Sequence, residues 1–251
     1  MAEETDPRSE PLDPFGRAIR DFARGEQDEP LYQCGDGSGH DREHPIEAFY
    51  FGEFDPDSEA NAWLLDRLDP DGPVLDMGAG AGRHSLYLQD RAGTVAIDPS
   101  EHLVATMRER GVVDARVGDM FALTAQFERD RFRSALAIGT QVGLAGSMDG
   151  LRAFLSDLAY VTHPDGRAVL DCYDPGAAGA SDLLGFREDP APGLAHRVMH
   201  FEYEGDVGPT LHFRLFAPDR LREACVGTRW TVTEVRYGEE GVHYRAALAK
   251  R

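Results

Sequence analysis

One stretch decides the fold of this chain: Val74-Leu75-Asp76-Met77-Gly78-Ala79-Gly80-Ala81-Gly82-Arg83-His84. Its apolar start followed by Asp76 predicts the carboxyl end of a buried parallel strand. Three alternate glycines follow, and glycine permits positive φ and close approach of another group to the backbone. The run from His84 to Arg91 then predicts a helix whose first amide groups point toward the glycines. A strand, a glycine turn and a helix in this order predict a site for a nucleotide-like cofactor.

A second apolar strand, Thr94–Asp98, also ends in an acid. Asp98 lies about 18 residues after Gly80, close to the spacing at which an acidic residue binds the ribose of a nucleotide. A carboxylate at this place accepts hydrogen bonds from both ribose hydroxyls, each contributing about 1.5–3 kcal/mol when water is excluded. We therefore expect Asp98 to bind the ribose of the cofactor.

Further strands are predicted at 115–117, 134–139 and 167–173, the last after the turn at 164–166. Helices are predicted between the strands, one capped by Ser100 and another by Ser147 or Asp149. Strands that alternate with helices form a parallel sheet through right-handed crossovers, and ligands bind at the carboxyl ends of the strands. At the end of the chain, 230–237 and 242–248 predict a closing hairpin.

The combined motif reads D-x-G-x-G-x-G over Asp76–Gly82, with Gly118-Asp119 after the third strand and Pro164-Asp165-Gly166 before the fifth. The dinucleotide pattern G-x-G-x-x-G instead requires a glycine where this chain has Arg83. The chain resembles the class I S-adenosylmethionine-dependent methyltransferases, by motif over residues 46–174 and by layout from residue 216. The resemblance implies an α/β fold with a Rossmann-like, seven-stranded, mostly parallel sheet and helices on both faces. It further implies one closing antiparallel strand, an N-terminal helical cap, an inserted β-hairpin, and S-adenosyl-L-methionine as the cofactor.

The resemblance also assigns residues to the cofactor site. Asp119 is similar to the family's acid that accepts from the adenine amino group, with Met120 against the ring. Tyr50 and Phe51 resemble aromatic residues that close over the cofactor, with core packing as the alternative, and Arg83 is expected to pair with the cofactor carboxylate or with a neighbouring acid. The residues expected to bind the cofactor are Asp76, Gly78, Ala79, Gly80, Gly82, Arg83, Asp98, Pro99, Ser100, Asp119, Met120, Ile138, Gly139, Tyr50 and Phe51.

The methyl acceptor is expected beside the loop after the fourth strand, where Thr140 and Gln141 are candidates for catalytic contacts. His200 and His212, on the arms of a hairpin predicted from 196–203 and 210–215, are candidates for a general base. The chain has neither the Asp/Asn-Pro-Pro-aromatic motif of nucleic-acid amino-methyltransferases nor the Pro-Cys nucleophile of pyrimidine methylation, so we expect a small-molecule acceptor. Two alternatives stay open: an NAD(P)-dependent oxidoreductase, and a cofactor-binding regulatory protein without turnover.

The charge of the chain bears on its partners and its surroundings. Lys and Arg number 26 against 45 Asp and Glu, for a net charge of −19, and Lys250 is the only lysine. This acid surplus predicts adaptation to molar salt, in which the Debye length falls to about 3 Å. It disfavours DNA and RNA as partners, because their binding depends on neutralising phosphates. No apolar run approaches the ~18 residues of a membrane span, so we expect no membrane segment.

Three scattered cysteines, Cys34, Cys172 and Cys225, predict a reducing compartment, the cytoplasm, rather than a disulfide framework. His40 and His44 lie in and beside a glycine-rich loop without the spacing of a zinc motif, so we expect no metal. We make no prediction of oligomeric state.

Four parts are predicted: an acidic tail and N-terminal cap over 1–45, a cofactor-binding core over 46–175, an inserted loop and hairpin over 176–215, and a C-terminal helix with closing strands over 216–251. The insertion leaves the sheet beside the expected methyl-transfer site, so we predict a lid that carries acceptor specificity; the alternative is a hairpin that only extends the sheet and covers hydrophobic surface. An inward polar face would place Arg214 toward an anionic acceptor. An inward aromatic face would place Phe201 and Phe213 toward an apolar one.

Overall fold

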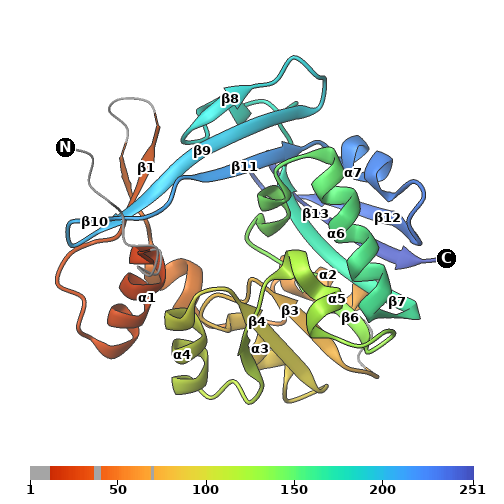
Figure 1. The fold of residues 1–251 in the computed structure, drawn as a ribbon, viewed down its shortest axis with the longest axis horizontal. Coiled ribbons are helices and arrows are strands. Elements are labelled where there is room, and N and C mark those ends of the chain that lie inside the picture. Colours follow the sequence, from red (N-terminus) through yellow and green to blue (C-terminus); the bar gives the residue numbers. More distant parts are fainter. Residues whose placement is uncertain (1–11, 37–40, 69–70) are drawn as a thin grey trace.

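The computed structural model describes residues 12–36, 41–68 and 71–251. Two sheets and their helices make up the fold in Figure 1. The larger sheet has seven strands in the order β12-β13-β7-β6-β3-β4-β5. Its strands are β3 (Val74–Met77), β4 (Thr94–Asp98), β5 (Ala115–Val117), β6 (Phe132–Ala137), β7 (Thr162–Tyr173), β12 (Trp230–Tyr237) and β13 (His243–Lys250).

Strands β3 to β7 pair in parallel, and β13 is antiparallel to both of its neighbours. The predicted seven-stranded, mostly parallel sheet with one antiparallel strand is therefore confirmed. The fifth strand begins earlier than expected, because Thr162 already pairs with Phe132. The chain then bulges out over 163–166 and rejoins β6 where Arg167 pairs with Ser134.

Helices cover both faces of the seven-stranded sheet because neighbouring residues of a strand point to opposite faces. The helices are α2 (Glu59–Arg67), α3 (Arg83–Leu88), α4 (Glu101–Glu109), α5 (Leu123–Gln126), α6 (Met148–Val161) and α7 (Pro218–Cys225). Leu75 packs in a buried cluster with residues of α5, α6 and α7. Val74 belongs to the opposite face, with residues of α2 and α3. The predicted caps are confirmed: Ser100 accepts from the Leu103 amide at 3.1 Å, and Ser147 from the Gly150 amide at 3.0 Å.

The second sheet is built around the long strand β9 (Leu194–Tyr203). Four strands pair with it antiparallel: β1 (Tyr32–Gly35), β8 (Phe186–Glu188), β10 (Asp206–Val207) and β11 (Leu211–Phe216). Strand β2 (Arg42–Glu43) extends the sheet through β1. The predicted hairpin is therefore β9 and β11. Short extended pieces were expected at Leu31-Tyr32 and Pro45-Ile46; the structure has β1 from Tyr32 and β2 over Arg42–Glu43, and pairs β1 with β9.

The N-terminal helix α1 (Pro14–Arg24) joins the two sheets. Asp13 caps it by accepting from the Gly16 amide at 2.8 Å. Ile19 is fully buried in a cluster with Leu103 of α4 and Phe201 of β9. In Figure 1, β9 and β11 run across the molecule from α1 toward α7, above the strands of the larger sheet. Within the described residues, no helix combines the length and the apolar character needed to cross a membrane.

Candidate active site

The glycine loop between β3 and α3 has the backbone that its sequence predicts. Gly78, Gly80 and Gly82 all have positive φ, at 64°, 58° and 80°. The Ala79 amide donates to the carbonyl of Ile97 in β4 at 3.1 Å, which fixes the loop against the neighbouring strand. A side chain at these positions would require a conformation that residues other than glycine rarely adopt.

Asp98 lies at the end of β4 with its carboxylate turned to the glycine loop. One oxygen accepts from the Gly80 amide at 3.1 Å and the other from the Ser100 amide at 3.0 Å. The residue is only 6% exposed, and burial raises its pKa to about 7 against these two hydrogen bonds. A buried acid that two backbone amides hold in place still has lone pairs for further donors.

Asp76, in the middle of β3, holds the next helix rather than the glycine loop. Its carboxylate accepts from the Ser85 hydroxyl at 2.6 Å, inside the first turn of α3. Burial raises the pKa of Asp76 to about 6, and the bonds from Ser85 oppose this shift. The backbone amides of the glycine loop are therefore left to other partners.

The ends of β4 and β5 carry the residues expected around an adenine ring. Asp119 is exposed after β5, where one carboxylate oxygen accepts from the Phe121 amide at 2.8 Å. Pro99 is exposed after β4, whereas Met120 is buried in the main core cluster. Ser100 serves structure, because its hydroxyl caps α4 and also contacts the Asp13 carboxylate.

Asp171 of β7 organises the loop after β6, in which Ile138 and Gly139 lead to Thr140. This carboxylate is buried and accepts from the Gly139 amide at 3.0 Å and the Thr140 amide at 2.5 Å. His243 of β13 adds a third contact, with Nε2 at 2.9 Å. Thr140 itself has a φ of 62°, a conformation that costs free energy in any residue with a Cβ.

Gln141 follows at the start of a short 3₁₀ helix, Gln141–Ala145. Its side-chain carbon Cδ lies 2.8 Å from the position that a Cβ on Gly78 would occupy. The loop after β6 and the glycine loop after β3 are thus in contact, as neighbouring parallel strands require. Thr140 and Gln141 lie beside the glycine loop, although nothing in their geometry assigns a chemical step to either.

Of the two aromatic residues expected to cover the site, Tyr50 lies over the glycine loop and Phe51 does not. The Tyr50 ring is 3.3 Å from the position of a Cβ on Gly80. Its hydroxyl is 3.0 Å from Nε2 of His44, and burial raises its pKa. The Phe51 ring instead packs against Phe22 of α1, 5.0 Å between centroids.

Arg83, at the start of α3, donates to the Glu53 carbonyl at 3.1 Å. Its Nε is buried, with no hydrogen-bond partner among the described residues.

The polar face of the β9–β11 hairpin looks away from the site. His200 forms a 2.8 Å contact with Glu202, and His212 stacks on His196 at 4.6 Å. On this outer face Arg214 forms an ion pair with Asp189 at 2.7 Å. The two histidines therefore lie on the side of the hairpin opposite Phe201.

A group of three possible metal ligands, Cys34, His200 and Glu202, also lies on this sheet, with ligand atoms within 4.8 Å of one another. Burial raises the pKa of the Cys34 thiol to about 12, which keeps it protonated at neutral pH. His40 lies outside the described residues.

The inner face of the hairpin is aromatic and leads back to the glycine loop. The Phe201 ring lies 4.6 Å from Phe15 of α1 and 5.3 Å from His44, which contacts Tyr50. On β11, the Phe213 ring lies 3.0 Å from the position of a Cβ on Gly143. Of the two orientations considered for this hairpin, the structure has the aromatic face inward.

Two functional candidates on the inner side were missed by the local pattern. One is Arg197, which the period-two alternation of the strand places on the face of Phe201. The other is Asp171, whose position at the end of an apolar strand was the available signal. Burial lowers the pKa of His44 to about 4, so this residue is neutral at pH 7.

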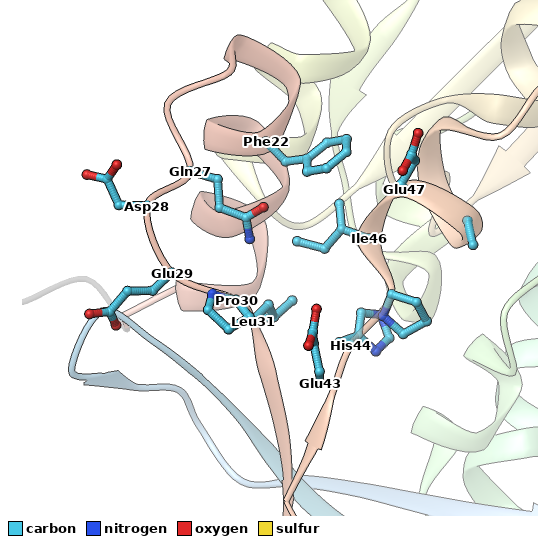
Figure 2. Close-up of a pocket in the computed structure, with 12 residues that line it drawn as sticks. Phe22, Gln27, Asp28, Glu29, Pro30, Leu31, Glu43, His44, Ile46 and Glu47 are labelled. Atoms are coloured by element: carbon cyan, nitrogen blue, oxygen red, sulfur yellow. The ribbon is translucent and has the colours of Figure 1, made fainter.

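A pocket of about 490 Å³ lies in the N-terminal cap and is separate from the glycine loop. Figure 2 shows Phe22 and Gln27 of the α1 region on one side and Ile46 and Glu47 on the other. None of its lining residues belongs to the glycine loop, β4 or β5. The pocket does include His44, which contacts Tyr50 over Gly80, so it borders the cover of the glycine loop.

The sequence and the fold are similar to those of known methyltransferases. Residues 74–166 match the family model of a methyltransferase domain. No curated protein matches the sequence. A SAM-dependent methyltransferase from Bacteroides fragilis, crystallised in complex with S-adenosyl-L-homocysteine, is 22% identical with a TM-score of 0.75, covering 96% of this chain and 98% of its own.

Two further structures are similar. An amino pentose methyltransferase from Micromonospora echinaspora is 17% identical with a TM-score of 0.59, covering 86% of this chain and 100% of its own. The CcbJ methyltransferase from Streptomyces caelestis is 17% identical with a TM-score of 0.58, covering 82% of this chain and 96% of its own. The matched segment 74–166 contains the glycine loop, Asp98 and Asp119. Residues 74–166 therefore match a methyltransferase domain by sequence, and the chain as a whole has the fold of these SAM-dependent methyltransferases.

Proposed function

We propose that this methyltransferase holds S-adenosyl-L-methionine at the carboxyl edge of β3, β4 and β5 and methylates a small molecule that the second sheet covers. The observation that carries the proposal is the packing of Phe201, His44 and Tyr50 in series over Gly80. These side chains come from the insertion and from the N-terminal segment, so the chain itself covers its glycine loop. Such a covered site suits an acceptor that is enclosed rather than one that lies across a surface.

The residues present fit the cofactor. We assign Asp98 to the ribose hydroxyls, because its buried carboxylate lies at the glycine loop and each oxygen, holding one backbone donor, has a lone pair left for another. Asp119 keeps one oxygen for the adenine amino group, and Pro99 is exposed at the neighbouring strand end. Tyr50 covers the loop at Gly80. We assign Gly78 and Ala79 to the methionine end, together with the Nε of Arg83, which has no described partner.

When bound, the cofactor supplies an electrophilic methyl group on a sulfonium. The contribution of this chain is orientation and exclusion of water, which together account for about 7–11 kcal/mol in well-aligned reactions. Asp171 holds the Gly139 and Thr140 amides, so the loop that faces the acceptor is rigid before binding. We keep Thr140 and Gln141 as the candidates for acceptor contacts.

The acceptor is proposed to be neither DNA nor RNA, because a net charge of −19 opposes binding of polyanions. We also propose that the enzyme works in a reducing compartment, the cytoplasm, which the three free and buried cysteines support.

Calorimetric titration and a transfer assay test this proposal together. S-adenosylhomocysteine should bind at micromolar concentrations or below, and NAD⁺ should not. With tritium-labelled S-adenosylmethionine and a cell extract separated into small-molecule, nucleic-acid and protein fractions, the label should enter the small molecules. Label in nucleic acid or protein would contradict the acceptor class, and NAD⁺ binding without S-adenosylhomocysteine binding would contradict the cofactor.

A further inference from the structure

Arg197 is a buried cation on the inner face of β9. It is 8% exposed, and its position opposite Phe213 in β11 sets it on the face that carries Phe201. Its Nε donates to the Leu184 carbonyl at 2.9 Å, and Nη2 lies 3.6 Å from the Met199 sulfur. The guanidinium carbon lies 5.5 Å from the centre of the Tyr173 ring.

No Asp or Glu among the described residues forms an ion pair with Arg197, although the chain has a large surplus of acids. Arginine is rarely buried to this degree without an acidic partner, because removing the charge from water is costly. Burial accordingly lowers the pKa of this guanidinium. Arg214, on the opposite face of the same hairpin, has its partner in Asp189 at 2.7 Å.

The surroundings of Arg197 connect it to both loops of the active site. Tyr173 ends β7 two residues after Asp171, which anchors Gly139 and Thr140. On its other side the charge of Arg197 helps to lower the pKa of His44, which contacts Tyr50 over Gly80. Because His44 is neutral, it provides no positive charge for an anion, and Arg197 does.

We propose that Arg197 binds a carboxylate of the methyl acceptor, while Phe201 and Phe213 contact an aromatic or apolar part of the same molecule. The inference rests on the proposed function, whose acceptor class it narrows. A guanidinium pairs with a carboxylate through two parallel hydrogen bonds, and a single buried cation balances one negative charge. A phosphate dianion would leave a second charge uncompensated, so a carboxylate is the group that this site fits.

Benzoate, benzamide and phenyl phosphate are suitable probes because they share a phenyl ring and differ in charge. Each is titrated into the full-length protein saturated with S-adenosylhomocysteine. We expect benzoate to bind at least about tenfold more tightly than either of the others. Arg197→Met should weaken benzoate binding at least about tenfold and leave S-adenosylhomocysteine affinity within about twofold. Arg197→Lys should recover part of the benzoate affinity.

Arg214→Met is the matched control, because it removes the same charge from the outer face of the same hairpin. It should leave benzoate affinity within about twofold of the parent. The inference is overturned if benzoate does not bind, if benzamide or phenyl phosphate binds as well, or if both Arg197 variants keep the parent affinity. If Arg197→Met does not fold, Arg197→Lys and the probe series still decide. If the parent protein does not bind S-adenosylhomocysteine, that result contradicts the cofactor assignment but not the role of Arg197. Benzoate titrated into the protein without S-adenosylhomocysteine then tests Arg197.

Discussion

Replacing Asp98 with asparagine is expected to stabilise the free protein while weakening cofactor binding. Burial raises the pKa of Asp98 to about 7, whereas an aspartate in an unfolded chain titrates near about 3.9. Between these values the native state retains a proton that the unfolded state has lost. The free energy of unfolding therefore falls as pH rises through this window, by about 4 kcal/mol in total at about 1.36 kcal/mol per pH unit.

Asparagine carries no charge and removes this loss of stability. Its NH₂ group, however, must replace one of the two carboxylate oxygens, so the backbone amide of either Gly80 or Ser100 loses its acceptor. An unsatisfied buried donor costs about 1–3 kcal/mol. Above about pH 7 the Asp98→Asn protein should therefore be more stable than the parent by about 1–3 kcal/mol, which raises Tm by about 2–4 °C for each kcal/mol.

Cofactor affinity should change in the opposite direction. Exchanging charge-assisted hydrogen bonds to the ribose for neutral ones costs about 2–3 kcal/mol, or a rise of about 30- to 150-fold in the Kd of S-adenosylhomocysteine. In the parent, affinity should fall as pH drops below about 7, approaching tenfold per pH unit, because the ionised fraction of Asp98 shrinks. The variant should lose this dependence on pH.

Scanning calorimetry and isothermal titration between about pH 6 and about pH 8 measure both effects. Asp90→Asn, at an exposed position after α3, is the matched control and should change neither quantity. A variant that is less stable than the parent at about pH 8 would show that Asp98 mainly holds the glycine loop. An unchanged Kd would remove Asp98 from the cofactor site.

Three further predictions concern the surface, the glycine loop and the cover of the site. Screening the charge of −19 should raise Tm steeply from low salt to molar KCl, and a flat salt profile would contradict adaptation to salt. Gly82→Ala should destabilise the protein to urea by about 2–4 kcal/mol, because φ is 80° and the new Cβ would lie 2.7 Å from Val112; Gly93→Ala, with no atom within 4 Å, should cost about 1 kcal/mol or less. Tyr50→Ala should weaken S-adenosylhomocysteine binding about tenfold through loss of the ring over Gly80, whereas Phe49→Ala, at a 56% exposed position, should not; equal effects on titration would mean that Tyr50 does not cover the cofactor.

Local sequence pattern was sufficient for the part of the protein that contains the glycine loop and the parallel strands. Alternate glycines after an apolar strand predicted a turn with positive φ, and all three glycines have it. Ser100 was recognised as a helix cap because capping depends on residues three positions apart. The spacing of Asp98 from Gly80 predicted their proximity, and a hydrogen bond joins them. These features need only neighbours along the chain or the fixed geometry of adjacent parallel strands.

The second sheet required the tertiary structure. Strand β1 pairs with β9 across more than half of the chain, and no short-range pattern encodes which distant strand a four-residue strand will meet. Alternation along β9 separates Phe201 from His200, but it is equally consistent with either face inward. Contact of Phe201 with Phe15 of α1 decides the orientation.

For Arg197, the local sequence pattern predicts the face of the strand, and only the tertiary structure shows its surroundings. Period-two alternation alone places it on the face of Phe201. Its burial among a carbonyl, a thioether and an aromatic ring, without an acidic partner among the described residues, arises only when β8, β9 and the end of β7 come together. The sequence by itself determined the parallel sheet and the cofactor loop, because local backbone preferences and strand-end spacing control them. The covering of that loop and the charge on its inner face were decided by packing between segments far apart in the chain, which depends on the free energy of the whole fold.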